Sequence, residues 1–272
     1  MKRALMLLML AALVNADFLI ERVDVVISDI QSDGSARVHE SIKFVMFGNY
    51  SNSLYDSGIP SNELSYWSGI TALKDVKFHV NPAKVDIRDF RLRPQPRTKC
   101  NPIQGICHGE LVLDYMAYPS YNNSSVADPD TGLIKVEKYK PRTNRYSINP
   151  AALSFTTTPE GNIILEDTVF LTIELPSESV LLDLNPAPAD VSLKLPAHVG
   201  SLLWSDIVLV KFTLIFDVED SIDKEVSDFF SSIIIWIAQL LSGPGGLPVM
   251  LLLAAIIGSC FYIIMAKRRG EE

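Results

Sequence analysis

The sequence predicts a mainly β protein: one or two antiparallel β-sandwich domains, then a short interfacial helix and one transmembrane helix. Apolar and polar residues alternate with a period of two through most of the chain, the pattern of half-buried strands. Gly, Pro and Asn turns separate these stretches, and no long stretch with helical periodicity precedes residue 224. Nineteen residues without a charge follow at 247–265, enough for a membrane-spanning helix.

Alternation locates the strands in order. The strands are expected at 23–27, 36–46, 76–80, 85–87, 111–115, 169–175 and 208–218. One apolar face on each strand predicts antiparallel sheets that bury this face against another sheet, as in Ig-like sandwiches.

The expected organisation has seven parts, and the polar, turn-rich stretch 122–146 marks a boundary. The part after this boundary is either a second domain or the second half of the same sandwich. The parts are a signal peptide (1–16), a β-sandwich domain (17–121), a loop or linker (122–146), a β-rich part (147–222), an apolar helix (224–242), a transmembrane helix (247–266) and a cytoplasmic tail (267–272).

The composition bounds the function. The chain has 272 residues, of which 48% are hydrophobic, which argues against disorder. With 14 Gly, 16 Pro and 3 Cys it is neither collagen-like nor a disulfide-dense miniprotein. The net charge of −8 argues against nucleic-acid binding, which needs a basic surface.

The two ends predict the topology. Lys2 and Arg3 precede the apolar run 4–14, and Val14-Asn15-Ala16 fits a signal-peptidase site. The basic residues 267–269 follow the apolar span and indicate a cytoplasmic C-terminus. We therefore expect a single-pass protein of the cell membrane with its ectodomain outside the cytoplasm. Ala254 and Gly258 give the span a small face for helix packing.

The apolar segment 229–241 is too short to cross a bilayer, and Gly and Pro at 243–246 separate it from the span. Trp236 favours the headgroup region, and Ile234 and Ile235 supply an apolar surface. The segment is expected either to lie on the membrane or against a partner's helices, or to be the last buried part of the ectodomain.

Glu40 interrupts the apolar face of the strand at 36–46. A buried carboxylate needs a cation or several hydrogen-bond donors, and Arg91 and Arg93 are candidate partners for an ion pair. The alternatives are a bulge or edge position that exposes Glu40, and a functional acid.

Cys100 and Cys107 bracket Pro102 and Gly105, which in an exported domain predicts a disulfide that closes a short loop. Free thiols and a metal site with His108 are the alternatives, but a fourth metal ligand is missing. Asn49, Asn122 and Asn123 fit the N-glycosylation pattern.

Basic residues gather in 88–99 and 135–145. Ion pairs on solvated strand faces are the expected arrangement, and an anion-binding patch for a glycan or headgroup is the alternative.

Two stretches resemble known families. Val23–Phe44, with its turn at Asp33-Gly34 and the spacing Val38-x-Glu40-x-Ile42-x-Phe44, resembles the opening of DUF2207-like prokaryotic membrane proteins. Leu175-Pro176, 181–188 and Leu203-Trp204 are similar to a β-sandwich pattern of archaeal surface proteins. The resemblance implies a β-rich extracytoplasmic domain next to a membrane. It implies no activity.

We therefore expect a non-enzymatic surface protein of the envelope or adhesion type, with no catalytic residue, cofactor or metal. Its expected partners are the lipid bilayer and another membrane or surface protein, and glycan binding stays open. One alternative is an accessory subunit that docks through 229–265 onto a larger membrane complex. A minor alternative is an exported hydrolase that uses Glu40 with His39 or His79.

Overall fold

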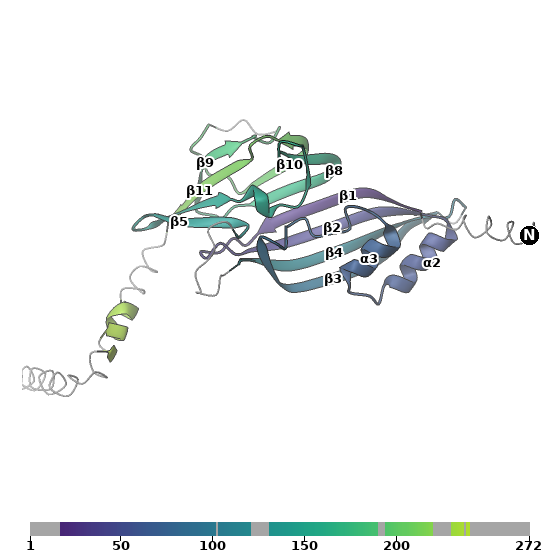
Figure 1. Ribbon diagram of the computed structural model, residues 1–272, viewed down its shortest axis with the longest axis horizontal. Helices are drawn as coiled ribbons and strands as arrows, with labels where there is room; N and C mark the ends of the chain where they lie inside the picture. Colours follow the sequence, from purple (N-terminus) through teal and green to yellow (C-terminus); the bar gives the residue numbers. More distant parts are fainter. Residues whose placement is uncertain are drawn as a thin grey trace, which may run out of the picture. The chain divides into compact units, whose positions relative to one another are not determined.

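The computed structural model describes residues 17–101, 103–120, 131–189, 194–219, 230–236 and 238–239. The chain divides into two compact units, Met1–Glu219 and Asp220–Glu272. The first unit is mainly β and contains two sheets (Figure 1).

The first sheet is built on a long hairpin of β1 and β2. Its strands follow the order β10-β8-β1-β2-β4-β3, and the short β7 also pairs with β8. Their bounds are β1 (Asp17–Ser28), β2 (Ala36–Phe47), β3 (Val85–Asn101), β4 (Ile106–Pro119), β7 (Thr156–Thr157), β8 (Ile163–Glu174) and β10 (Ser201–Leu209).

The second sheet has four strands in the order β5-β6-β11-β9. They are β5 (Ile134–Lys140), β6 (Thr143–Ile148), β9 (Ser179–Asn185) and β11 (Thr213–Glu219). β5 and most of β6 thus occupy the stretch 122–146, which was expected as a loop or linker. Residues 122–130 of this stretch lie outside the described residues. Val136 and Tyr146 pair across the two strands, so β5 and β6 form a hairpin. The polar composition of this stretch led to the expectation of a loop.

The first sheet is not purely antiparallel, which corrects the expected sheet type. β1 pairs with β8 in parallel, with Val25 opposite Leu171 and Ile27 opposite Ile173, while the other pairs are antiparallel. All four of these side chains are fully buried. Alternation predicts this buried face correctly. The alternating pattern is the same for parallel and antiparallel neighbours, so it does not predict the direction of the neighbouring strand.

The expected strand 208–218 is two strands in different sheets. β10 ends at Leu209 and β11 begins at Thr213. Between them Lys211 has a left-handed φ of 48°, and its N–H donates to Oδ1 of Asn162. The side chain of Asn185 donates to the carbonyls of Val210 and Lys211. These contacts hold a turn in which the alternation of the sequence continues unbroken.

Residues 76–80 were expected to form a strand, but only Val80 makes an isolated bridge, to Leu153. Two short helices also precede this segment: α2 (Gly48–Gly58) and α3 (Leu64–Thr71). α2 contacts β1, β2 and β4, and α3 contacts α2 (Figure 1). Tyr55 and Trp67 are their fully buried aromatic residues, with ring centroids 5.2 Å apart.

A single-turn 3-10 helix (Pro150–Ala152) follows β6. The core of the unit is one hydrophobic cluster that draws on both sheets and the two helices. Its largest fully buried side chains include Trp67, Trp204, Tyr55, Phe44 and Phe216.

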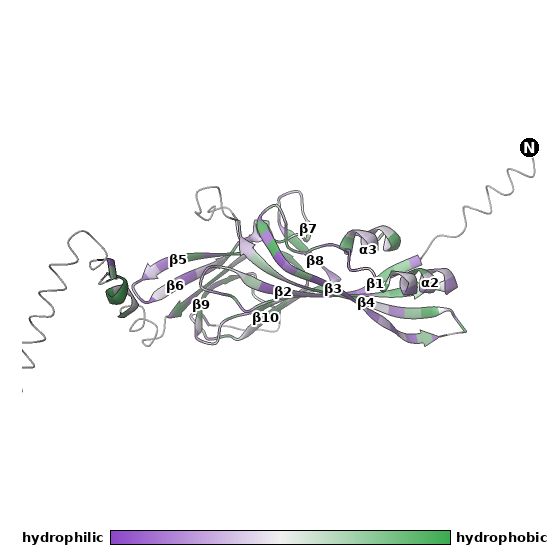
Figure 2. Ribbon diagram, turned by 90° about the horizontal axis from the view of Figure 1, so that it is seen from below, coloured by the Kyte–Doolittle hydropathy of each residue, from purple (hydrophilic) through white to green (hydrophobic). Residues whose placement is uncertain are grey.

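In the second unit, residues 230–236 and 238–239 are helical. Figure 2 shows this segment, which follows β11, in the colour of hydrophobic residues. No helix in the described part of the chain is long and apolar enough to cross a membrane. The expected span 247–266, with Ala254 and Gly258, lies outside the described residues, as does the expected signal peptide 1–16.

Candidate functional site

The outer face of the first sheet, which carries His39, Arg91 and Asp114, is the face turned away from the core. It bears an open pocket of about 400 Å³. The pocket is lined by Arg37, Asp89, Arg91, Arg93, Asp114, Tyr115 and Met116.

Strand register brings these side chains together. Arg37 on β2 lies opposite Met116 on β4, and Asp114 on β4 lies opposite Arg91 on β3. The register of β3 shifts between Arg88 and Arg91, where Asp89 has a left-handed φ of 55°. This bulge lets Arg88 and Arg91 share the outer face although they are three positions apart.

Asp114 is the most heavily paired acid in the pocket. Its carboxylate lies 2.7 Å from Nδ1 of His39 and also accepts a hydrogen bond from Arg93. Burial by itself raises the pKa of Asp114, but the hydrogen bonds and charges of His39 and Arg93 lower it by more, to below the usual value. Asp114 is therefore a carboxylate at neutral pH.

The three arginines of the pocket differ in their pairing. Arg93 binds Asp114, and Arg37 lies 3.0 Å from Asp29 in an exposed ion pair. Arg91 makes no hydrogen bond or ion pair with any residue that the structure describes, and it is exposed. The pocket therefore presents an unpaired guanidinium.

A second polar cluster lies on the core side of the same strands. Glu40 is fully buried and accepts hydrogen bonds from the backbone N–H of His79 at 3.0 Å and from the hydroxyl of Tyr115. Its other carboxylate oxygen lies 2.8 Å from Nδ1 of His79, whose side chain is 1% exposed. Three polar contacts thus satisfy both oxygen atoms of the buried carboxylate.

The expected partner of Glu40 was wrong, although its buried position was expected. Glu40 lies opposite Leu113, whereas Arg91 lies opposite Asp114 and Arg93 lies opposite Val112. Residues directly opposite each other share a face, so both arginines are on the outer face and cannot reach Glu40.

The buried cluster stabilises the neutral phenol of Tyr115. Burial raises the pKa of Tyr115 well above its ordinary value, and the nearby charge of Glu40 and the hydrogen bond to it raise it further. The ring of His79 packs against Phe155 with centroids 5.3 Å apart, and its Nε2 has no partner among the described residues. Glu40 and His79 thus meet, as the hydrolase alternative required, but neither is exposed to a substrate. His39 lies on the opposite face.

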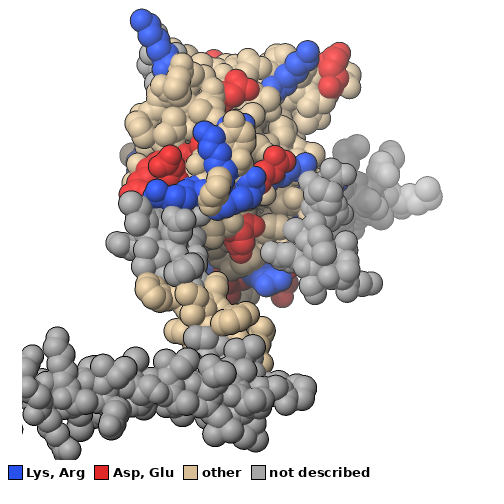
Figure 3. All heavy atoms as spheres, turned by 90° about the vertical axis from the view of Figure 1, so that its left-hand side faces the viewer, with Lys and Arg blue, Asp and Glu red and all other residues tan. Residues whose placement is uncertain are grey.

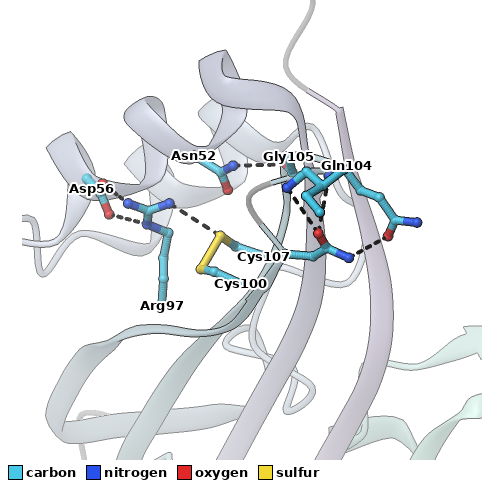
Figure 4. The surroundings of a disulfide bond; sticks show 9 residues. Asn52, Asp56, Arg97, Cys100, Gln104, Gly105 and Cys107 are labelled. Atoms are coloured by element: carbon cyan, nitrogen blue, oxygen red, sulfur yellow. Dashed lines mark hydrogen bonds and ion pairs between the residues drawn. A yellow bond between two sulfur atoms is a disulfide. The ribbon is translucent and has the colours of Figure 1, made fainter.

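Cys100 and Cys107 form a disulfide, as the sequence predicted. Figure 4 shows its surroundings: Arg97 donates to Sγ of Cys107 and forms two hydrogen bonds with Asp56 of α2. The amide of Asn52 donates to the carbonyl of Gly105 in the loop that the disulfide closes. The disulfide therefore fixes the end of the β3–β4 hairpin where it packs against α2.

The remaining predicted residues lie apart from the pocket. Asn49 is exposed in the first turn of α2, while Asn122 and Asn123 lie outside the described residues. Phe230, Ile234, Ile235 and Trp236 are 57–66% exposed.

The described residues include no group of three or more His, Cys, Asp or Glu side chains placed to hold a metal ion.

Arg145, in the basic stretch 135–145, is paired with an acid. Arg145 makes two hydrogen bonds with Asp217, at 2.8 and 2.9 Å, and its guanidinium lies 3.8 Å from the centre of the Tyr139 ring. Figure 3 shows basic and acidic side chains next to one another on the face that it presents. For Arg145 this is the expected arrangement of an ion pair on a strand.

Sequence reasoning missed Arg37, Asp114 and Tyr115. The signal for Arg37 and Asp114 is their position on the polar face of their strands, opposite the apolar residues. His79 was named only as a partner of Glu40 in the hydrolase alternative, and its burial had no such signal, because residues 76–80 form no regular strand.

Comparisons with known proteins add little. No protein-family model matches the chain, and the search of curated proteins finds no match. Native leukotriene A4 hydrolase from Saccharomyces cerevisiae is similar with a TM-score of 0.31 and 8% identity. Yeast LTA4 hydrolase in complex with bestatin has a TM-score of 0.30 and 9% identity. Each match covers 75% of this chain and 29% of the other. The chain thus spans less than a third of these proteins, and likeness at this level supports no conclusion about fold or activity.

Proposed function

We propose that the chain is a single-span protein of the cell surface, whose β-rich ectodomain acts by binding rather than by catalysis. The observation that carries this proposal is the helical segment 230–236, on which Phe230, Ile234, Ile235 and Trp236 are 57–66% exposed. Exposed apolar residues of this kind belong at a membrane surface or a protein interface. The apolar stretch 247–265 and the basic residues 267–269 follow a few residues later.

The Cys100–Cys107 disulfide supports an extracytoplasmic ectodomain, because thiols in the cytosol are usually kept reduced. In this proposal the two sheets form a sandwich-type ectodomain, and 224–242 lies in the interface of the outer leaflet.

Protease protection tests this placement. The protein would carry one epitope in the exposed loop around Gly161 and a second tag after Glu272, and intact cells would receive an external protease. Digestion of the first epitope with survival of the second is expected. Digestion of the second tag, or protection of the first epitope until the cells are lysed, would contradict the proposal.

An accessory subunit of a larger membrane complex is the second candidate, and the same exposed residues favour it. It predicts that stoichiometric partners copurify in mild detergent and are lost when 229–272 is removed. Ile234→Glu would release these partners, while Ser231→Glu, a matched charge on the same helix, would keep them. Partners that stay with the ectodomain alone would exclude docking through this helix.

A further inference from the structure

We propose that the outer-face pocket binds an acidic sugar residue, whose carboxylate pairs with Arg91. This ligand assignment rests on the proposed surface-binding function and gives it a chemical class. The pocket volume of about 400 Å³ lies in the range of small-ligand sites, roughly 300–1,000 Å³.

Arg91 is the anchor in this proposal. Its guanidinium is exposed, lines the pocket and has no partner among the described residues. A planar guanidinium pairs with a carboxylate through two parallel hydrogen bonds, which gives both strength and orientation. The bulge at Asp89 places Arg91 on this face, so the position of Arg91 is set by the backbone conformation of β3.

The charges of the pocket favour a monoanion. Three arginines line it, but Arg37 pairs with Asp29 and Arg93 pairs with Asp114, so Arg91 is the pocket arginine without an acid partner among the described residues. A single carboxylate balances the charge of this guanidinium. A phosphate dianion would leave the site negative and would place its second charge near the carboxylates of Asp89 and Asp114.

The remaining lining residues fit the rest of a sugar. The carboxylates of Asp89 and Asp114 can accept hydrogen bonds from ring hydroxyls, and Arg37 and Arg93 can donate to them. Met116 supplies an apolar surface between the charged groups. Because the whole chain carries −8, a long polyanion is repelled, so the fitting ligand is a single acidic residue on an otherwise neutral glycan.

Saturation-transfer NMR on the full-length protein in a sugar-free polyoxyethylene detergent tests the proposal. The probes are methyl glucuronide, methyl glucoside, which lacks only the carboxylate, and inorganic phosphate. We expect the glucuronide to bind at least about ten-fold more tightly than either of the others.

Arg91→Ala is expected to weaken glucuronide binding about ten-fold or more, because the charged hydrogen bonds are lost. Arg88→Ala is the matched control on the same strand: its guanidinium binds Asp86 and lies outside the pocket, so binding should change less than about two-fold. Arg91 has no described partner, so the variant should fold normally, which thermal unfolding checks.

Equal binding of the glucuronide and glucoside, or an unchanged affinity in Arg91→Ala, would overturn the assignment. Phosphate binding as tight as that of the glucuronide would also overturn it, in favour of a general anion site. These results are independent of protease protection on cells. If the glucuronide does not bind but protease protection gives the expected topology, only the sugar assignment is rejected. If protease protection gives the opposite topology, only the proposed surface placement is rejected.

Discussion

The imidazole Nδ1 of His79 lies 2.8 Å from the carboxylate of Glu40, and both side chains are buried in the core of the first unit. The backbone N–H of His79 and the hydroxyl of Tyr115 bind the same carboxylate. Glu40 therefore joins β2, β4 and the irregular segment before β3. A buried carboxylate of this kind is tolerated because hydrogen-bond donors face both of its oxygen atoms.

Glu40→Ala is expected to lower the free energy of unfolding by about 2–4 kcal/mol, because it leaves two buried donors and the His79 ring without their acceptor. Urea unfolding measures the change. Glu166→Ala, which removes an exposed ion pair with Lys74, should cost less than about 1 kcal/mol. A Glu40→Ala protein as stable as the wild type would show that the cluster contributes nothing to stability.

Two tyrosines are expected to ionise late in an alkaline titration. Burial raises the pKa of Tyr55 to about 12, and burial together with Glu40 raises the pKa of Tyr115 well above 10. The folded state holds these protons more tightly than the unfolded state, so the stabilisation is complete below pH 10 and is lost as the pH rises through the folded pKa values. Absorbance at 295 nm follows phenolate formation.

Tyr55→Phe and Tyr115→Phe should each remove one late step from that titration. Each should also flatten the loss of stability above pH 10. If the late steps persist in both variants, other tyrosines are responsible and the assignment fails.

Substitution by alanine should change the stability of the protein in opposite directions at Gly109 and Gly69. A Cβ on Gly109 would lie 2.8 Å from the ring of Phe44 and 2.9 Å from that of Tyr55, so Gly109→Ala should destabilise by about 1–3 kcal/mol. Gly69 is exposed in α3, and no atom lies within 4 Å of an added Cβ. Gly69→Ala should therefore stabilise by about 0.5–1 kcal/mol. A stabilised Gly109→Ala protein in thermal unfolding would mean that the two rings move aside.

Removal of the Cys100–Cys107 disulfide should cost roughly 2.5 kcal/mol, from the chain entropy of its eight-residue loop. The double variant Cys100→Ser/Cys107→Ser should unfold at lower urea, and reductant should not affect it further. Reductant should lower the urea concentration at which the wild type unfolds, toward that of the variant. A wild type that unfolds identically with and without reductant would indicate that the bond does not stabilise the fold.

The strands were predictable because alternation is a local property. Val23, Val25 and Ile27 were expected on the buried face of one strand, and all three are fully buried in β1. The short helices α2 and α3 were not predicted, since each depends on a few buried aromatic residues such as Tyr55 and Trp67 rather than on a long apolar stripe.

The pocket was predictable only in part. The sequence showed the basic stretch 88–99. Its two pocket arginines form a site only together with Arg37 and Asp114, which lie on other strands. The bulge at Asp89 is also invisible in the alternation, and it decides which face Arg91 occupies.

The sequence by itself determined the mainly β class, the buried face of most strands and the disulfide, because these depend on residues close along the chain. The tertiary structure alone decided that β1 runs parallel to β8, that β10 and β11 enter different sheets, and that His79 rather than an arginine meets Glu40. The partners in that cluster are 39 and 75 residues apart. A local pattern specifies which way a side chain points, whereas its partner depends on the register of the whole assembled sheet.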